Sequence, residues 1–136
     1  NNVGPNDGVP LFVMVELPSN VLDAKNFITR MELHGGSIGS NDLVQTVYAV
    51  SRDDLEGYQH PVDARSPAVK TMIRQAIKEF TDAGLEIGIC GQAPSDYPEE
   101  FPEFLIDCGI TSISVTPDTA MAVRISIEKA EKKLLN

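Results

Sequence analysis

The chain has 136 residues, of which 42% are hydrophobic and 23% are charged, as in an ordinary soluble globular protein. Its length predicts a single domain, residues 1–136. A formal net charge of −9 argues against nucleic acid as a partner, because phosphate contacts need a basic face. No apolar run approaches the roughly 18 residues of a membrane span. The two cysteines, Cys90 and Cys108, favour reduced thiols in a cytoplasmic protein over a disulfide framework.

The first quarter of the chain predicts two strands and a helix. Residues 11–17 form a nearly continuous apolar run, the pattern of a strand buried on both faces. Residues 18–20, Pro-Ser-Asn, supply capping side chains for a helix, whose apolar stripe extends to residue 31. The glycine pair at 35–36 is expected to break this helix, and a short second strand follows at 37–39.

The middle of the chain predicts a second strand–helix alternation. A helical turn is expected over 41–50, followed by an ordered, charged loop over 51–65. The pair Ser66-Pro67 is a strong helix start, and Gly84 ends the core-facing stripe that follows. Residues 85–90 are the third predicted strand.

The last third completes the pattern. A short helix is expected up to Cys108, a fourth strand over 111–115, and a final helix after Pro117. The inward face of this last helix is predicted to carry four apolar residues, Val123, Ile127, Ala130 and Leu134. Strands alternating with amphipathic helices predict right-handed βα units, a parallel sheet and an α/β fold.

Polar residues follow the ends of all four predicted strands, where parallel α/β folds bind their ligands. They are Glu16, Ser40-Asn41-Asp42, Cys90-Gly91-Gln92, and Thr116 with Asp118. Neighbouring strands are about 4.8 Å apart, so carboxylates that follow adjacent strands could share a cation. Proteins usually hold Mg²⁺ by one or two carboxylates together with water and substrate oxygens.

Each of these residues also has a structural interpretation. Glu16 could be a charge in a strand-terminal loop, and Asp42 could be a helix cap. Cys90 could be a small buried hydrophobe, or a protonated thiol that faces the site and donates a proton. For Cys108, near a helix end, core packing is the better interpretation. His34 has no partner at metal-ligand spacing, so zinc is not expected.

Several segments go beyond these patterns and resemble the family of phosphoenolpyruvate-utilising enzymes, above all its synthases. Their relatives are pyruvate phosphate dikinase and enzyme I of the sugar phosphotransferase system, which share the barrel. The matching segments are Met14–Asn20 (MVELPSN), Ser37–Leu43 with Gln45 (SIGSNDL), Arg65–Val69 (RSPAV), Gly88–Asp96 (GICGQAPSD), and Ser112–Val115 with Pro117-Asp118. They lie in the family's order and cover residues from about 10 to 127.

The resemblance implies a role for each candidate residue. Glu16 and Asp42 are the implied Mg²⁺ ligands, and Asn41 contacts the phosphoryl group of phosphoenolpyruvate. Arg52 matches an arginine that helps to bind phosphate. Cys90 matches the cysteine that moves a proton at the methyl carbon of the enolpyruvate. Gln92, in the same segment as Cys90, is a further substrate-binding candidate.

The resemblance also implies that only part of a larger enzyme is present. The family barrel has eight strands, and this chain resembles the C-terminal half of that TIM barrel, with about four strands and four helices. The phosphate-clamping arginines of the early strands, the phosphohistidine domain and the ATP-binding domain have no counterpart. We therefore expect a phosphotransferase segment that is inactive alone and that self-associates through its exposed sheet face and two open edges.

Two other functions remain open from the sequence. Citrate-lyase and related aldolase barrels also hold Mg²⁺ by a Glu and an Asp to bind pyruvate-type enolates. A non-catalytic, oligomerising module derived from the family is the second alternative. The cysteine segment and the spacing from Asn41 to Arg52 favour the phosphotransferase.

Overall fold

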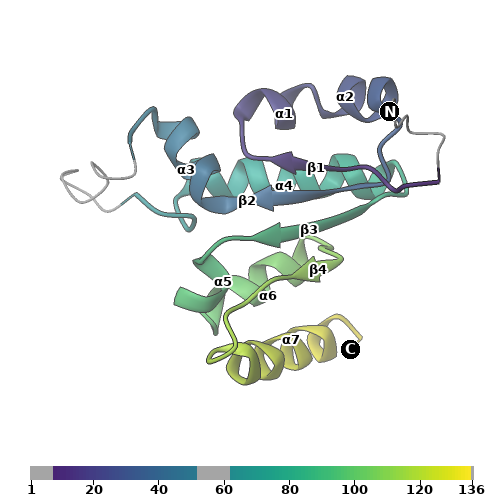
Figure 1. Ribbon diagram of the computed structural model, residues 1–136. Helices are drawn as coiled ribbons and strands as arrows, with labels where there is room; N and C mark the ends of the chain where they lie inside the picture. The colour runs from purple at the N-terminus through teal and green to yellow at the C-terminus, as the bar shows by residue number, and fades with distance from the viewer. Residues whose placement is uncertain (1–7, 52–61, 136) are drawn as a thin grey trace.

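The computed structural model describes residues 8–51 and 62–135. Its centre is a parallel sheet of four strands in the order β1-β2-β3-β4. The strands are β1 (Phe12–Val15), β2 (Gly35–Gly39), β3 (Glu86–Cys90) and β4 (Ser112–Ile113). Their arrowheads all point to the left in Figure 1, so the carboxyl ends of the strands form one edge of the sheet. The α/β class and the parallel sheet predicted from the sequence are confirmed.

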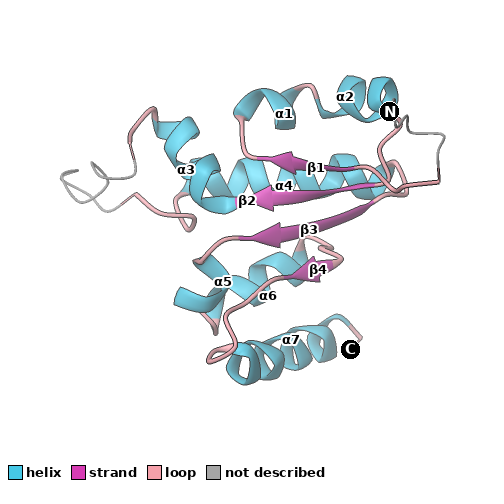
Figure 2. Ribbon diagram, viewed as in Figure 1, coloured by secondary structure: helices cyan, strands magenta, loops and turns pink. Residues whose placement is uncertain are grey.

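Helices connect the strands, and the part of the chain that the structure describes contains seven of them. They are α1 (Pro18–Leu22), α2 (Ala24–Met31), α3 (Ser40–Tyr48), α4 (Pro67–Asp82), α5 (Ala93–Asp96), α6 (Glu100–Asp107) and α7 (Ala120–Leu134). Figure 2 shows the alternation of strand and helix along the chain. Each consecutive pair of strands lies side by side in the sheet, as in a βα barrel.

The hydrophobic core lies between one face of the sheet and the helices behind it. Because side chains alternate along a strand, Val15, Ile38 and Ile89 point to the same face, and each is at most 1% exposed. Ile73 and Phe80 of α4 belong to the same core and are likewise buried. The predicted stripe of α4 is therefore confirmed.

The opposite face of the sheet has no helix over it among the described residues, as the front of the sheet in Figure 1 shows. Phe12 and Met14 point to this face and are 51% and 42% exposed. In a closed βα barrel this face would be the interior, and helices would cover only the outside. The arrangement is consistent with half of such a barrel, as the sequence predicts.

The predicted break at Gly35 and Gly36 is wrong, because both residues lie within β2. A Cβ atom on Gly36 would lie 2.7 Å from the Phe80 ring, and one on Gly35 would collide with the Phe12 ring. Glycine at these positions therefore makes room for aromatic rings on both faces of the strand. Helix α2 instead ends at Met31, and its C-cap residue Glu32 has a left-handed φ of 49°.

The segment predicted as one helix up to residue 31 is two helices, α1 and α2, separated at Asp23. The Asn20 side chain accepts a hydrogen bond from the Leu17 backbone N–H at 3.2 Å and fixes the start of α1. The Asp23 carboxylate accepts a bond from the Asn26 side chain at 2.6 Å at the start of α2. These local side-chain bonds favour two short helices over one long one.

Further differences lie in the C-terminal third. Helix α5 was not expected, because its four residues are too few to show a helical period. In α7, Val123 and Ala130 are buried as predicted, whereas Leu134 is 62% exposed. Helix α7 packs mainly against α6, and Leu134 in its last turn lies beyond the core. No helix of the described ranges has the length and apolar character needed to cross a membrane.

Candidate functional site

Three segments with predicted site residues meet at the carboxyl edge of the sheet. Glu16 follows β1 directly, Asn41 and Asp42 lie in the first turn of α3 after β2, and Cys90 is the last residue of β3. The strand register pairs Gly39, the last residue of β2, with Cys90. The structure therefore gathers these predicted residues around the end of β2.

The Glu16 carboxylate lies against Gly39. A Cβ atom on Gly39 would be 2.8 Å from Glu16 Oε2, so only glycine leaves room for the carboxylate there. The Thr46 hydroxyl donates a hydrogen bond to the Glu16 carbonyl oxygen at 2.8 Å and ties the end of β1 to α3. Glu16 is half-buried, and no Lys or Arg of residues 8–51 and 62–135 forms an ion pair with it.

Asp42 is not a helix cap. The N-cap position of α3 is Gly39, and this helix end has no side-chain cap hydrogen bond. Asp42 is exposed in the first turn, where its carboxylate accepts a hydrogen bond from Gln45 Nε2 at 3.2 Å. A negative charge is favourable at this end of the helix dipole, and the bond from Gln45 fixes the rotamer of the carboxylate.

The chemistry of this donor set is compatible with Mg²⁺. Glu16 lies against Gly39 at the end of β2, Asp42 lies in the first turn of the helix that follows Gly39, and both carry hard carboxylate oxygens. No group of three or more His, Cys, Asp or Glu side chains that could hold a metal occurs within the described ranges. Mg²⁺ characteristically takes one or two carboxylates and completes its shell with water and substrate oxygens.

The turn after β3 packs closely on the first turn of α3. The Ser40 hydroxyl is fully buried and donates a hydrogen bond to the Cys90 carbonyl oxygen at 3.2 Å. Gly91 has a left-handed φ of 119°, and a Cβ atom there would collide with Ser40 Oγ and lie 3.3 Å from Asn41 Oδ1. This glycine therefore allows the close approach that brings the Asn41 side chain beside the β3–α5 turn.

The two cysteines have different environments. Cys90 is half-buried and lies outside the core cluster, next to Gly39 in the register. Because residues paired in parallel strands share a face, its side chain points to the same uncovered face as Glu16. Cys108 packs against the core, as predicted. Burial raises the pKa of the Cys108 thiol, and nearby Arg74 partly offsets this.

A cavity of about 190 Å³ lies beside the strand ends. It is lined by Asn41, Val44, Gln45, Val62, Asp63, Ala64, Gln92, Ala93, Asp96 and Tyr97. The predicted residues thus divide into two sets. Asn41 and Gln92 line the cavity, whereas Glu16, Asp42 and Cys90 lie outside its lining.

Two other predicted features contribute less. Arg52 lies outside the described residues, so its place relative to the site is not part of the structure. Thr116 and Asp118 belong to a local turn before α7. Hydrogen bonds from the Thr116 side chain and from the local backbone hold the pKa of Asp118 below its ordinary value. The Thr116 N–H also donates to Ser95 Oγ at 2.9 Å, which connects the end of β4 to α5.

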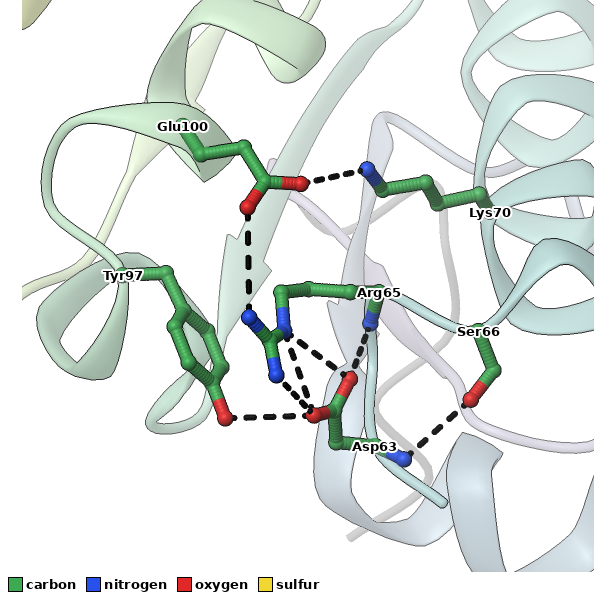
Figure 3. A network of polar contacts seen from close by, with 6 residues as sticks. All are labelled: Asp63, Arg65, Ser66, Lys70, Tyr97 and Glu100. Atoms are coloured by element: carbon green, nitrogen blue, oxygen red, sulfur yellow. Dashed lines mark hydrogen bonds and ion pairs between the residues drawn. The ribbon is translucent and has the colours of Figure 1, made fainter. Parts of the chain in front are cut away.

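Sequence reasoning missed a polar cluster at the cavity wall (Figure 3). Asp63 accepts a hydrogen bond from Arg65 Nη2 at 2.8 Å and another from the Tyr97 hydroxyl at 3.1 Å. The Arg65 guanidinium carbon lies 3.7 Å from the centre of the Tyr97 ring. Glu100 adds an ion pair with Lys70 at 3.0 Å and a longer one with Arg65 at 3.9 Å.

This cluster changes the ionisation of two of its members. Burial pushes the pKa of Asp63 up, but hydrogen bonds from Arg65 and Tyr97 outweigh it and leave that pKa below its ordinary value. Burial and the neighbouring Asp63 carboxylate raise the pKa of Tyr97. The sequence did hold a signal: Asp63 lies two residues before Arg65, and its carboxylate accepts the Arg65 N–H at 2.7 Å, an Asx turn. The contact with Tyr97, 34 positions away, left no such signal.

Comparison with known proteins agrees with these features. Residues 1–132 match the family described as PEP-utilising enzyme, PEP-binding domain. A phosphoenolpyruvate synthase of Aquifex aeolicus is 44% identical over 128 residues, which are 94% of this chain and 14% of the relative. The phosphoenolpyruvate synthase of Synechocystis sp. is 46% identical over 94% of this chain. That of Escherichia coli is 37% identical over 93% of this chain. The matched residues are 15% of each of these two relatives. The chain thus spans about one seventh of the length of these relatives.

The matched range includes the described residues up to 132, and with them the strand ends that carry Glu16, Asp42 and Cys90 and the cavity. The chain belongs to the family of PEP-utilising enzymes and corresponds to their PEP-binding domain.

Proposed function

We propose that this chain carries the metal-binding and acid–base part of a phosphoenolpyruvate synthase-type phosphotransferase. The observation that carries the proposal is the position of the Glu16 carboxylate against Gly39, which the register pairs with Cys90. A carboxylate and a thiol on the same uncovered sheet face suit a ligand that is both a metal chelator and a carbon acid. The names of the relatives support the same reaction class.

Each residue has a distinct role in this proposal. Glu16 and Asp42 hold Mg²⁺, which when bound supplies Lewis-acid stabilisation of a pyruvate-type enolate. The Cys90 thiol holds the proton that is exchanged with the methyl carbon. The side-chain amides of Asn41 and Gln92 donate hydrogen bonds to the phosphoryl oxygens from the edge of the cavity.

We also propose that the isolated chain does not complete the reaction. The cavity lining contains two carboxylates, Asp63 and Asp96, and no Lys or Arg among the described residues. The Arg65 guanidinium beside it is engaged by Asp63. Charge neutralisation of a phosphoryl group must then come from elsewhere, either from Arg52 or from the rest of a protein about seven times as long.

Self-association and a cytoplasmic location remain predictions of the same proposal. Among the described residues, no helix covers the sheet face that carries Phe12, and no further strand pairs with the outer edges of β1 and β4. These features support an association that buries them, either with a second copy or with the missing half of the barrel. The aldolase-type and non-catalytic alternatives have no specific observation in their favour.

The test is calorimetric titration of the chain with oxalate, an enolate mimic, in the presence and absence of Mg²⁺. We expect binding only with Mg²⁺. Glu16→Gln should weaken it at least about ten-fold, since even outer partners of metal ligands are worth that much. The matched control is Glu86→Gln, which removes an exposed carboxylate at the opposite end of the sheet, at the start of β3. Equal affinities of wild type and Glu16→Gln would refute the proposed metal site.

A further inference from the structure

The cluster of Asp63, Arg65 and Tyr97 joins two walls of the cavity. Asp63 belongs to the segment between α3 and α4, and Tyr97 directly follows α5. Both residues line the cavity, so the hydrogen bond from the Tyr97 hydroxyl to Asp63 Oδ2 joins two segments of its lining. The close-up in Figure 3 shows the Arg65 guanidinium beside the Tyr97 ring, with both donors directed at the Asp63 carboxylate.

Apolar packing and local hydrogen bonds hold the segment that carries Asp63, in which Ala64 is buried in the core and Val62 packs against it. Residues 62–66 form no strand, and within them the backbone makes one turn bond, from the Ser66 N–H to the Asp63 carbonyl oxygen at 3.0 Å. The Ser66 hydroxyl accepts a hydrogen bond from the Asp63 N–H at 3.2 Å. These bonds are internal to the segment. The polar contacts of this segment with Tyr97 are made by the side chains of Asp63 and Arg65.

The geometry of the cluster demands these particular residue types. Arg65 Nε and Nη2 both donate to Asp63 Oδ2, at 3.2 and 2.8 Å, while the flat guanidinium stacks on the Tyr97 ring. Only arginine combines a planar fork with a face that can stack, so lysine would keep the charge and lose the arrangement. The Asp63 side chain is 26% exposed, so most of it is shielded from water.

The predicted substrate-binding amides line the same cavity. Asn41 projects from α3, and Gln92 occupies the N-cap position of α5, five residues before Tyr97. Backbone hydrogen bonds connect the two ends of α5: the Gln92 carbonyl accepts from the Asp96 N–H at 2.8 Å, and the Ala93 carbonyl accepts from the Tyr97 N–H at 3.0 Å. Gln92 and Tyr97 thus adjoin the two ends of one short helical turn.

We propose that Asp63, Arg65 and Tyr97 form a positioning cluster that sets the width of this cavity and thereby aligns the side-chain amides of Asn41 and Gln92 for the phosphoryl group of the ligand. The inference rests on the proposed function, which supplies that ligand. None of the three residues is a catalytic residue, because each acts through the placement of the two amides.

Ligand binding tests the proposal with two probes. Phosphoenolpyruvate with Mg²⁺ carries the phosphoryl group, whereas oxalate with Mg²⁺ does not. We expect Tyr97→Phe and Arg65→Lys to weaken phosphoenolpyruvate binding about five-fold, the effect of one misaligned hydrogen bond, and to leave oxalate unchanged. The matched control is Asp82→Asn, which breaks an exposed ion pair with Lys78 at the far end of α4. Equal losses for both probes, or no loss for either, would overturn the positioning role.

A measurement without ligand tests the positioning role independently of the proposed function. In ¹H–¹⁵N spectra of the chain, Tyr97→Phe and Arg65→Lys should shift the side-chain NH₂ signals of Asn41 and Gln92, whereas Asp82→Asn should not. Thermal unfolding of each variant shows whether it is folded. If wild type binds neither probe, the proposed function fails, and the NMR result still decides the positioning role. Amide signals that stay in place in folded variants would refute it.

Discussion

The Glu16 carboxylate occupies the space that a side chain at position 39 would fill, because a Cβ atom on Gly39 would lie 2.8 Å from Glu16 Oε2. A glycine at the end of one strand thus makes room for the carboxylate that follows its neighbour. This relationship explains how a charge at the end of an apolar strand reaches the sheet edge rather than the core. The position of the carboxylate therefore depends on Gly39, and a side chain at that position would displace it.

Gly39→Ala should displace the Glu16 carboxylate. Gly39 has an ordinary φ of −82°, so alanine meets no backbone strain, and the effect comes from the collision alone. We expect Mg²⁺-dependent oxalate binding to be lost and stability to fall by about 1–3 kcal/mol, as for other overpacked positions. Calorimetry and urea unfolding measure the two effects. Gly88→Ala is the control, because its Cβ would collide with Ser112 on the same face and far from Glu16; equal loss of oxalate binding in both variants would contradict the argument.

Asp63→Asn should lower the pKa of Tyr97. Burial is the largest cause of its raised pKa, and the charge and hydrogen bond of Asp63 are the next two, which asparagine weakens or removes. Absorbance titration near 295 nm measures tyrosine ionisation, and a parallel titration of Tyr97→Phe separates Tyr97 from Tyr48 and Tyr58. An unchanged Tyr97 transition in Asp63→Asn would show that burial alone sets this pKa.

The same cluster should make stability depend on alkaline pH. Since the folded-state pKa of Tyr97 is raised, its contribution is complete below the ordinary tyrosine pKa of about 10 and is lost as pH rises through the folded value. The urea midpoint of wild type should therefore fall more steeply above that pH than the midpoint of Tyr97→Phe. Parallel declines in the two proteins would contradict this linkage.

The Cys108 thiol should react slowly with alkylating agents, and its reactivity should depend on Arg74. Burial, the largest cause, raises its pKa, and the charge of Arg74 opposes the rise. Arg74→Met should therefore move the pH midpoint of Cys108 alkylation by iodoacetamide further upward. Peptide mass spectrometry follows Cys108 separately from Cys90, and the same assay in urea gives the unfolded reference. A midpoint in folded protein equal to that in urea would rule out the effect of burial.

The uncovered sheet face should drive association of the isolated chain. Phe12 and Met14 expose apolar surface beside the free edge of β1, and burial of that surface is favourable. Sedimentation should show a concentration-dependent oligomer that Phe12→Ser weakens. Leu135→Ser is the control, because Leu135 is 86% exposed just past α7 and away from the sheet. A wild-type chain that stays monomeric at high concentration would contradict this prediction.

The two cluster residues Arg65 and Tyr97 show where sequence reasoning stops. The segment Arg65–Val69 predicted the start of α4 correctly, because a serine and a proline carry a local signal for a helix end. The same segment did not predict a stacked contact with Tyr97, because that contact depends on the packing of α5 against the segment before α4. The glycine pair at 35–36 was misread for the same reason, since its need for glycine comes from Phe12 and Phe80.

The sequence alone determined the order of strands and helices, the parallel sheet, the family, and the residues at the strand ends. These follow from periodicity, local capping signals and short motifs, which act over a few residues. The tertiary structure decided which of those residues lie together. Glu16 meets Gly39 through the packing of strand on strand, and Asn41 and Gln92 share a cavity with Asp63 and Tyr97. Close approach between distant segments depends on register and side-chain volume, and a one-dimensional pattern contains neither.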